Sequence, residues 1–416
     1  MSSVGGGREG AEATPEVPPP LDSDDVAAIA ILLVAAADLG SWLAGSSIAV
    51  VGLRALWVLI YLVTAARLLQ RYGTEWVAWT IRHQPALSAL LVLTLASCLW
   101  SLAPALTLRK AVSLLGTTVL GLFIGFIAPP QRITRVLAWA FGVLVVSSIA
   151  VTLLWPASTQ PLGWRGILSH KNSLGAAAAL AAIVWLIFTL RRRVHPVWGV
   201  ALSVLSLLAL VGARSRTAFL ALGVSLLAAA YLAIGGGAPG STHAVVRRMT
   251  IGLVLAVSIT PFLVAPLATV LGTSDPLNGR LALWDGTLTI LRERPLTGYG
   301  YDAVWGRDDA TLLPHIPITA WRSSKNAHNS IADIASQLGI PAAIIGCLYL
   351  LGALIAAGRL VERAPSTFAY CAFAVLLGMT VMSFTEAHLL RIHSIFWMLF
   401  VALTVSAQRA LPSELE

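Results

Sequence analysis

Charged residues are scarce in this chain of 416 residues: Asp, Glu, Lys and Arg make up only 11% of it, whereas hydrophobic residues make up 57%. A soluble globular domain of ordinary composition carries about 25% charged residues, so that class of protein is excluded. Cysteine is also rare, and Cys98, Cys347 and Cys371 all lie within apolar runs, without the spacing of metal ligands. We therefore expect neither a disulfide framework nor a metal site.

The sequence also lacks a single basic stripe. Its formal net charge is +9, but the basic residues are scattered between apolar segments, which argues against a nucleic-acid partner. Residues 1–25 are rich in Gly, Pro and acidic residues and cannot bury an apolar face, so they are predicted to be a disordered cytoplasmic tail. They do not have the basic start, apolar run and cleavage site of a signal peptide.

Long apolar runs are abundant. A membrane-spanning helix needs roughly 20 mainly apolar residues, since its backbone must satisfy its own hydrogen bonds in lipid. The runs predict an all-α polytopic membrane protein with about twelve spans, a membrane domain at 26–411 and a cytoplasmic tail at 412–416. The spans are expected to begin near Val26, Ile48, Ala86, Arg109, Arg135, Ser173, Val197, Arg216, Met249, Asn329, Phe368 and Leu390. No internal repeat is evident, which argues against a transporter built from inverted halves.

Basic residues predict the topology, because cytoplasmic connections are enriched in Lys and Arg. With an even number of spans both termini are cytoplasmic, and every inner connection is basic. The inner set is Arg67, Arg71, Arg82, Arg132, Arg135, Arg191, Arg192, Arg193, Arg247, Arg248, Arg359 and Arg363. The outer ends also hold cations, against this rule: Arg109, Lys110, Arg165, Lys171, Arg214, Arg216 and Arg391. These misplaced charges predict an anion-binding site on the outer face.

A long connection at 272–328 separates the ninth and tenth spans. It contains tryptophan, proline and charges of both signs, and it is extracytoplasmic in this topology. Loops of this length inside a compact domain are usually functional.

A histidine stands at the end of this loop, in SSKNAHNSIADIASQLGIP at 323–341. Asn326 and Asn329 flank His328 and are good helix caps, so a span is expected to begin here. The positive end of a helix favours a neutral imidazole, which can act as a general base near neutral pH. The alternative is a cap residue at the membrane interface that only holds the loop, and for a lone histidine that alternative is favoured.

Two arginines interrupt the apolar sequence GARSRTAFLALG at 212–223. Arg214 and Arg216 lie at an outer end, and guanidinium groups offer planar donors to phosphate oxygens. The alternative is that they extend to the lipid headgroups, as arginines at the ends of spans often do.

Five further candidates come from the long loop and from an earlier outer helix entrance. Arg280 and Trp284 are four residues apart, so a helix would place them on one face. The stretch GWRGILSHKNSLG contributes Arg165, Lys171 and Asn172 at the entrance of a span. Together with Arg214 and Arg216 these residues predict a cationic outer vestibule.

The stretch SFTEAHLLRIH at 383–393 places Glu386 near an outer span end and Arg391 shortly after it. An ionisable residue at membrane depth is functional by default and needs a basic partner. We expect Glu386 to pair with an arginine and hold it in position, which is a structural role.

In their order, SRTAFL, GRLALW, GYGYDAVW and NAHNSIADIASQLGI resemble the motifs of the O-antigen ligase and polysaccharide polymerase superfamily. The resemblance covers about residues 163–400. GYGYDAVW and SHKNSLG look most like the exopolysaccharide polymerase branch.

The resemblance implies a metal-independent glycosyltransferase of the GT-C shape, with no cofactor, in the bacterial cytoplasmic membrane and with an extracytoplasmic active site. Its expected donor is a glycan on a polyprenyl (undecaprenyl) diphosphate, and its acceptor a glycan or glycolipid. Membrane lipids and other polysaccharide-export proteins are the expected partners. By motif, Arg216 and Arg280 correspond to the diphosphate ligands, and His328 to the base that acts on the acceptor hydroxyl.

Two other functions compete with this one. A transporter or flippase for an anionic lipid-linked or soluble substrate could use the same arginines, but it should have broken helices near mid-membrane and related halves. A structural membrane subunit would account for the spans, but not for the arginines at the outer ends.

Overall fold

The computed structural model describes residues 21–37, 39, 46–127, 129–155, 159–160, 163–234, 280–305 and 325–411. The helices of these ranges are α1 (Ser23–Ala36), α3 (Ser47–Tyr72), α4 (Glu75–His83), α5 (Pro85–Ala96), the 3-10 turn η1 (Ser97–Leu99), α6 (Pro104–Ile127), α7 (Pro130–Leu154), α8 (Lys171–Leu190), α9 (Pro196–Ala213), α10 (Arg216–Ile234), α12 (Arg280–Glu293), α14 (Ser330–Leu338), α15 (Ile340–Arg363), α16 (Thr367–Ser383) and α17 (Ile395–Arg409). Two short antiparallel strands, β1 (Thr159–Gln160) and β2 (Gly163–Trp164), lie between α7 and α8.

Seven helices of the described part are long and apolar enough to cross a membrane: α3, α6, α7, α8, α9, α10 and α15. Shorter apolar helices cover Pro85–Leu99, Thr367–Ser383 and Ile395–Arg409. The chain is thus an all-α polytopic membrane protein, as predicted. The count of about twelve spans stays a prediction, because the span expected from Met249 lies outside the described residues.

Prolines and capping side chains mark where the helices begin. Pro85, Pro130 and Pro196 each occupy a first helical position, where a missing N–H costs nothing. Ser366 and Ser394 accept hydrogen bonds from the first turns of α16 and α17. Apolar runs that begin with a proline or a capping residue therefore form helices, and these helices start near the residues predicted from the sequence.

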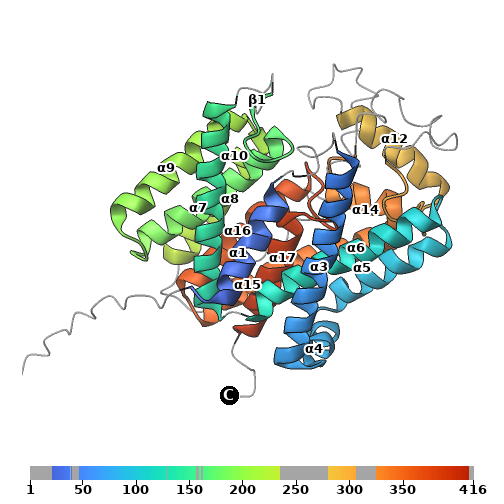
Figure 1. The fold of residues 1–416 in the computed structure, drawn as a ribbon, viewed down its shortest axis with the longest axis horizontal. Helices are drawn as coiled ribbons and strands as arrows, with labels where there is room; N and C mark the ends of the chain where they lie inside the picture. The colour runs from blue at the N-terminus through green and yellow to red at the C-terminus, as the bar shows by residue number, and fades with distance from the viewer. Residues whose placement is uncertain are drawn as a thin grey trace, which may run out of the picture.

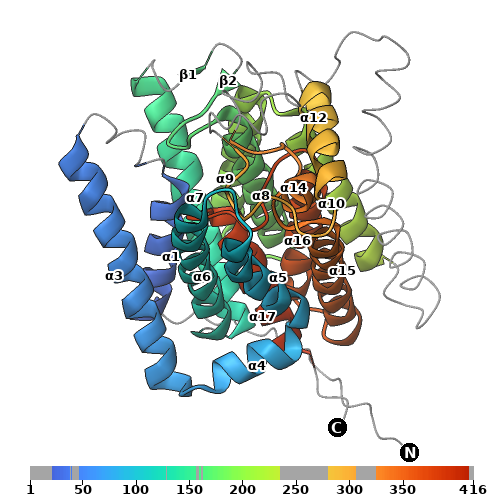
Figure 2. The same cartoon turned by 90° about the vertical axis from the view of Figure 1, so that its right-hand side faces the viewer.

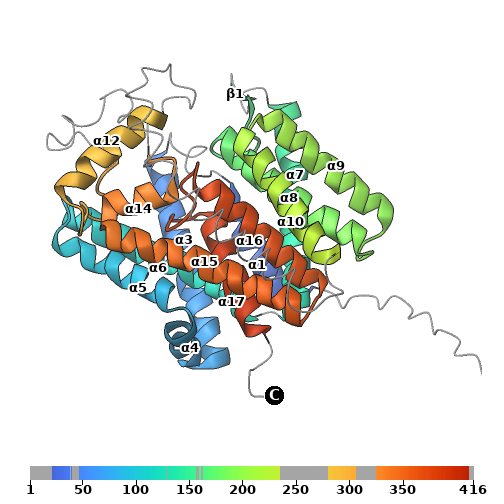
Figure 3. The same cartoon turned by 180° about the vertical axis from the view of Figure 1, so that it is seen from behind.

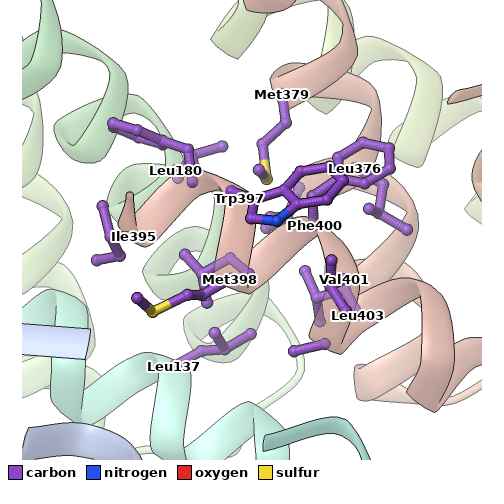
Figure 4. Packing of buried hydrophobic residues seen from close by; sticks show 14 of the residues in the cluster. Leu137, Leu180, Leu376, Met379, Ile395, Trp397, Met398, Phe400, Val401 and Leu403 are labelled. Carbon is purple, nitrogen blue, oxygen red and sulfur yellow. The ribbon is translucent and has the colours of Figure 1, made fainter. Parts of the chain in front are cut away.

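Helices α16 and α17 form the centre of the bundle (Figure 1). In α16 every residue from Phe368 to Ser383 is buried, and in α17 burial extends from Ile395 to Ala407. Figure 4 shows Trp397 of α17 among Met379, Leu376 and Phe400. The indole N–H of Trp397 donates to Oγ1 of Thr118 at 2.9 Å, so the only polar group of this large side chain is satisfied.

Small residues let α6 approach α17 closely. A Cβ on Gly121 would lie 2.8 Å from the carbonyl oxygen of Met398, and one on Gly125 would lie 2.9 Å from that of Ala402. Membrane helices commonly pack at glycines four residues apart. Lipid is as apolar as the side chains, so close van der Waals contact between backbones stabilises the pair instead of the hydrophobic effect. This contact fixes α17, and with it the loop that precedes it.

Helix α4 lies at one end of the bundle, and α12 and the strands lie at the other (Figures 1 and 2). Ion pairs join basic residues near the end of α3, which leads into α4, and at the start of α7. Asp24 in the first turn of α1 binds Arg67 and, at 3.0 Å, Arg71 at the end of α3. Asp25 binds Arg132 of α7 at 2.9 Å. These contacts place part of the predicted cytoplasmic set at one end.

Two boundaries differ from the predictions. The predicted tail at 1–25 extends too far, because α1 begins at Ser23 and Asp22 caps it. The single span expected from Asn329 is two helices, since α14 ends at Leu338 and the membrane-long α15 begins at Ile340 (Figure 3). Gly339 between them has φ +88°, a left-handed conformation that ends a helix. The apolar run continues through this break, so hydrophobicity alone conceals it.

Candidate functional site

One carboxylate joins three elements at the end of the bundle opposite the basic end. Glu386 lies in the loop 384–394 between α16 and α17. Its Oε1 accepts hydrogen bonds from Arg280 Nη2 at 2.7 Å and from Asn172 Nδ2 at 2.6 Å, and its Oε2 lies 2.9 Å from Nδ1 of His328. Arg280, Asn172 and His328 lie far apart in the sequence, and all three contact Glu386. Each of the four residues was a candidate in the sequence analysis. Exposed fractions of 18% for Arg280 and 29% for His328 leave both open to a ligand.

The backbone around His328 holds the ring in place. His328 has φ +47°, an uncommon left-handed conformation for a residue with a side chain, and its N–H donates to Oδ1 of Asn326 at 2.8 Å. Asn329 caps α14 by accepting from the N–H groups of Ile331 and Ala332, each at 2.9 Å. Both asparagines thus fix the turn, although the helix they introduce is α14 and not the span itself.

Further hydrogen bonds join the loop 384–394 to the start of α14. The Asn329 side chain donates to the carbonyl of Phe384 at 2.8 Å, and the Ser330 hydroxyl donates to that of Glu386 at 3.1 Å. The N–H of His388 in turn donates to Ser330 Oγ at 2.9 Å. These backbone contacts fix Glu386 beside His328.

Helix α12 supports the site from its other side. The indole N–H of Trp284 donates to the carbonyl of Ala327 at 2.9 Å, one residue before His328. The N–H of Ala327 donates to Oδ1 of the buried Asp333 at 3.1 Å. Arg280 and Trp284 lie on the same helix, as predicted, but Trp284 supports the histidine turn while Arg280 points to the carboxylate.

The electrostatics assign the proton on His328. Burial raises the pKa of Glu386, but the hydrogen bond from His328 and the positive charge of Arg280 outweigh it and lower the pKa to about 2. An ionised carboxylate only accepts hydrogen bonds, so Nδ1 of His328 carries the proton. In the neutral ring Nε2 is then an acceptor, which is the arrangement of a histidine general base oriented by a carboxylate.

The entrance of α8 brings a second histidine to the site. His170 caps α8, with Nδ1 accepting from the N–H of Asn172 at 3.2 Å, and Asn172 reaches Glu386. Burial lowers the pKa of His170, against the opposing effect of Glu386. Lys171 is the first residue of α8. Arg165 lies before it in a turn, where its carbonyl accepts from the N–H of Leu168 at 3.1 Å.

Arg214 and Arg216 lie at the same end but not in this cluster. Both are exposed, and Arg214 has φ +51° at the end of α9. Ser215 between them packs against Gly175 in α8: a Cβ on Gly175 would lie 2.5 Å from that of Ser215. The start of α10, with Arg216, is thus next to the α8 entrance that holds Asn172.

Arg391 is placed apart from Glu386. Its Nη1 lies 3.7 Å from Oδ2 of Asp333, and its Nη2 donates to the carbonyl of Lys325 at 3.5 Å. Sequence reasoning missed Asp333. A signal for Asp333 was present, since it is the one charged residue in the otherwise uncharged stretch SIADIASQLGI. Within the described ranges no group of three or more His, Cys, Asp or Glu residues could hold a metal ion.

Comparison with known proteins gives one family match. Residues 201–347 match the family model described as O-antigen ligase. The match includes Arg216, Arg280 and His328, whereas Asn172 and Glu386 lie outside it. No curated protein matches the chain. Residues 201–347 of this multi-pass membrane protein are thus similar to the O-antigen ligase family.

Proposed function

We propose that this protein transfers a glycan from a polyprenyl diphosphate carrier to a hydroxyl of an acceptor glycan or glycolipid. One observation carries the proposal: Glu386 binds His328 through one oxygen and Arg280 through the other, at 2.9 and 2.7 Å. A base and a phosphate-binding cation thus lie side by side. The carboxylate fixes both, so neither group has to be reorganised during the reaction.

The reaction follows from the proton assignment. Nε2 of His328 takes the proton of the acceptor hydroxyl, whose oxygen forms a bond to the anomeric carbon of the donor. The bond from that carbon to the diphosphate oxygen breaks, and its electron pair leaves with the polyprenyl diphosphate. Attack opposite the leaving group inverts the anomeric configuration. Glu386 stabilises the imidazolium that forms.

The cations act on the leaving group. Arg280 uses one amino group for Glu386 and keeps other N–H donors for phosphate oxygens. Arg216 is exposed at the start of α10, beside the same site. Removing one donor that stabilises developing charge typically costs about 100-fold to 1,000-fold in kcat, and general base catalysis contributes about 100-fold to 10,000-fold. Because arginines supply this charge, we propose a metal-independent enzyme of the GT-C type.

The proposed location follows from the charges. The cluster of Arg67, Arg71 and Arg132 marks one end of the bundle, and cytoplasmic ends are basic. We therefore propose that the site, at the opposite end, faces away from the cytoplasm, with both termini cytoplasmic. The other parts of the predicted division remain in this proposal: an outer loop at 272–328 and a tail at 412–416, with a membrane domain that now begins with α1 at Ser23. The motifs SHKNSLG and GYGYDAVW support a role in exopolysaccharide synthesis.

Purified protein in lipid nanodiscs tests the proposal. The probe is an oligosaccharide on undecaprenyl diphosphate, supplied with candidate acceptors and EDTA but no nucleotide. We expect a joined glycan and free undecaprenyl diphosphate from the wild type, and a loss of at least about 100-fold in His328→Ala and Arg280→Ala. Arg292→Ala, at an exposed position of the same helix, is the control. A donor that stays intact with the wild type and every candidate acceptor would contradict the transferase and favour the competing transporter.

A further inference from the structure

The loop 384–394 connects two sides of the site. Near its start, Glu386 contacts α8 and α12 through Asn172 and Arg280. Near its end, the N–H of His393 donates to Thr117 of α6 at 3.2 Å, and its ring stacks on Trp57 of α3 with centroids 4.1 Å apart. The turn that carries His328 packs against the loop between these two ends.

A second group of cations lies toward the α6 end of this loop. We define the second cationic group as Arg391, Lys325 and Lys110. Arg391 contacts the backbone of Lys325, and Lys110 binds Asp302 at 2.9 Å. The Tyr301 hydroxyl joins the two parts, because it donates to the carbonyl of Leu390 at 2.6 Å. None of these residues contacts Glu386 among the described residues.

Arg391 is held in place but has donors to spare. A guanidinium group has five N–H donors, and within the described ranges Arg391 makes only the two long contacts at 3.5 and 3.7 Å. Its side chain is 26% exposed, while that of its anchor, Asp333, is only 4% exposed. A buried carboxylate thus orients an arginine whose remaining donors can bind a carboxylate bidentately.

The geometry of substitution gives this group a role. In an inverting displacement the incoming oxygen and the leaving oxygen lie on opposite sides of the anomeric carbon. The diphosphate then lies with Arg216 and Arg280, and the acceptor needs a binding group separate from these cations. The second cationic group, which makes no contact with Glu386 within the described ranges, is separate in this way. We propose that the acceptor is an acidic glycan and that Arg391, with Lys325, binds the carboxylate of one of its sugars. This inference rests on the proposed transferase function.

A matched pair of acceptors tests it. The acceptor glycan is isolated from the producing cells, and half of it is converted to the neutral form by carbodiimide activation and borohydride reduction of its carboxyl groups. The probe donor is the undecaprenyl diphosphate oligosaccharide. We expect the wild type to use the acidic form with a kcat/KM at least about 10-fold higher than the reduced form, as one charged hydrogen-bonded contact would give.

Variants assign the preference to residues. Arg391→Gln should remove most of it and leave the KM for the donor unchanged, whereas Arg391→Lys should restore part of it. Lys325→Gln, at an exposed position, gives a second readout if Arg391→Gln does not fold. Arg292→Gln removes one charge from the exposed end of α12 and should keep the full preference.

Several outcomes would overturn the inference: an isolated acceptor without carboxyl groups, equal use of both forms by the wild type, or an equal loss on both forms in Arg391→Gln. Release of undecaprenyl diphosphate separates the two proposals. Equal use of both acceptors with release overturns only the acidic acceptor, whereas no release with either acceptor overturns the transferase function as well.

Discussion

Glu386 Oε2 lies 2.9 Å from Nδ1 of His328, although the two residues are 58 positions apart in the chain. The loop 384–394 supplies the carboxylate, and the turn before α14 supplies the ring. Backbone hydrogen bonds through Ser330 hold the two segments together. Because the other oxygen of Glu386 binds Arg280, a change at this carboxylate alters the base and the cation together.

Glu386→Gln should therefore reduce kcat more than it changes protein stability. The amide keeps the shape of the side chain but loses the charge that holds the proton on Nδ1 of His328 and stabilises the imidazolium. We expect kcat to fall by about 100-fold or more, within the range for general base catalysis. Release of undecaprenyl diphosphate measures it. Asp285→Asn, an exposed carboxyl on α12, is the control, and wild-type activity in Glu386→Gln would reject the role of the carboxylate.

Arg280→Lys separates charge from geometry. Lysine keeps the positive charge, but it cannot donate to Glu386 and to a phosphate group through one planar group. We expect kcat/KM for the donor to lie between the wild type and Arg280→Ala, with the alanine variant about 100-fold to 1,000-fold below the wild type. Arg292→Lys, twelve residues further along the chain, should behave as the wild type. If Arg280→Lys were no more active than Arg280→Ala, the positive charge alone would not contribute to the reaction of the donor.

Sequence patterns indicated each of the residues that meet at Glu386 as a candidate, but not how they are joined. His328, Arg280, Asn172 and Glu386 each had a local signal: a cap, a helical spacing, a helix entrance or an acid at membrane depth. Their meeting depends on how α8, α12 and the loop 384–394 pack, and no local pattern contains that information. The pairing of Glu386 with an arginine was predicted, whereas its bond to the histidine was not.

The break between α14 and α15 escaped prediction for a different reason. All nine residues of α14 are buried, and its mainly apolar sequence runs directly into that of α15. The two helices therefore look like one long span in the sequence. Only Gly339 and Pro341 in QLGIP mark the boundary, and a glycine within an apolar run has several explanations. The tail boundary failed because Asp22, Asp24 and Asp25 are acidic but form the capped start of α1.

Acid should destabilise the protein through His388. Burial, with the nearby Arg391, lowers its pKa to about 4 against the opposing effect of Glu386, whereas the unfolded value is about 6.5. Above pH 6.5 the His388 side chain is neutral in both the folded and the unfolded state, so its protonation does not lower the free energy of unfolding there. Below it only the unfolded state gains the proton, and stability falls until about pH 4, by up to about 3 kcal/mol.

Thermal unfolding at pH 7.5 and pH 5 measures this effect. His388→Gln should reduce the shift of the midpoint between the two values, whatever its effect on stability at pH 7.5. Some pH dependence should remain in His388→Gln, because burial lowers the pKa of His393 to about 4 as well. His83→Gln, at an exposed position of α4, is the matched control. An unchanged pH dependence in His388→Gln would contradict the assignment.

Gly339→Ala should destabilise the protein, because the break between α14 and α15 requires glycine. Its φ of +88° strains any other residue, and a Cβ would lie 2.1 Å from the carbonyl oxygen of Leu296, which is backbone and cannot move away cheaply. We expect a loss of about 2 kcal/mol or more, measured as a lower midpoint of thermal unfolding. Gly352→Ala in α15 is the matched control: no atom lies within 4 Å of the added Cβ, and alanine favours the helix by up to about 1 kcal/mol.

Since α14 carries the cap that holds the His328 turn, Gly339→Ala should also lower kcat, whereas Gly352→Ala should not. Equal midpoints for the two variants would show that the left-handed break is not needed.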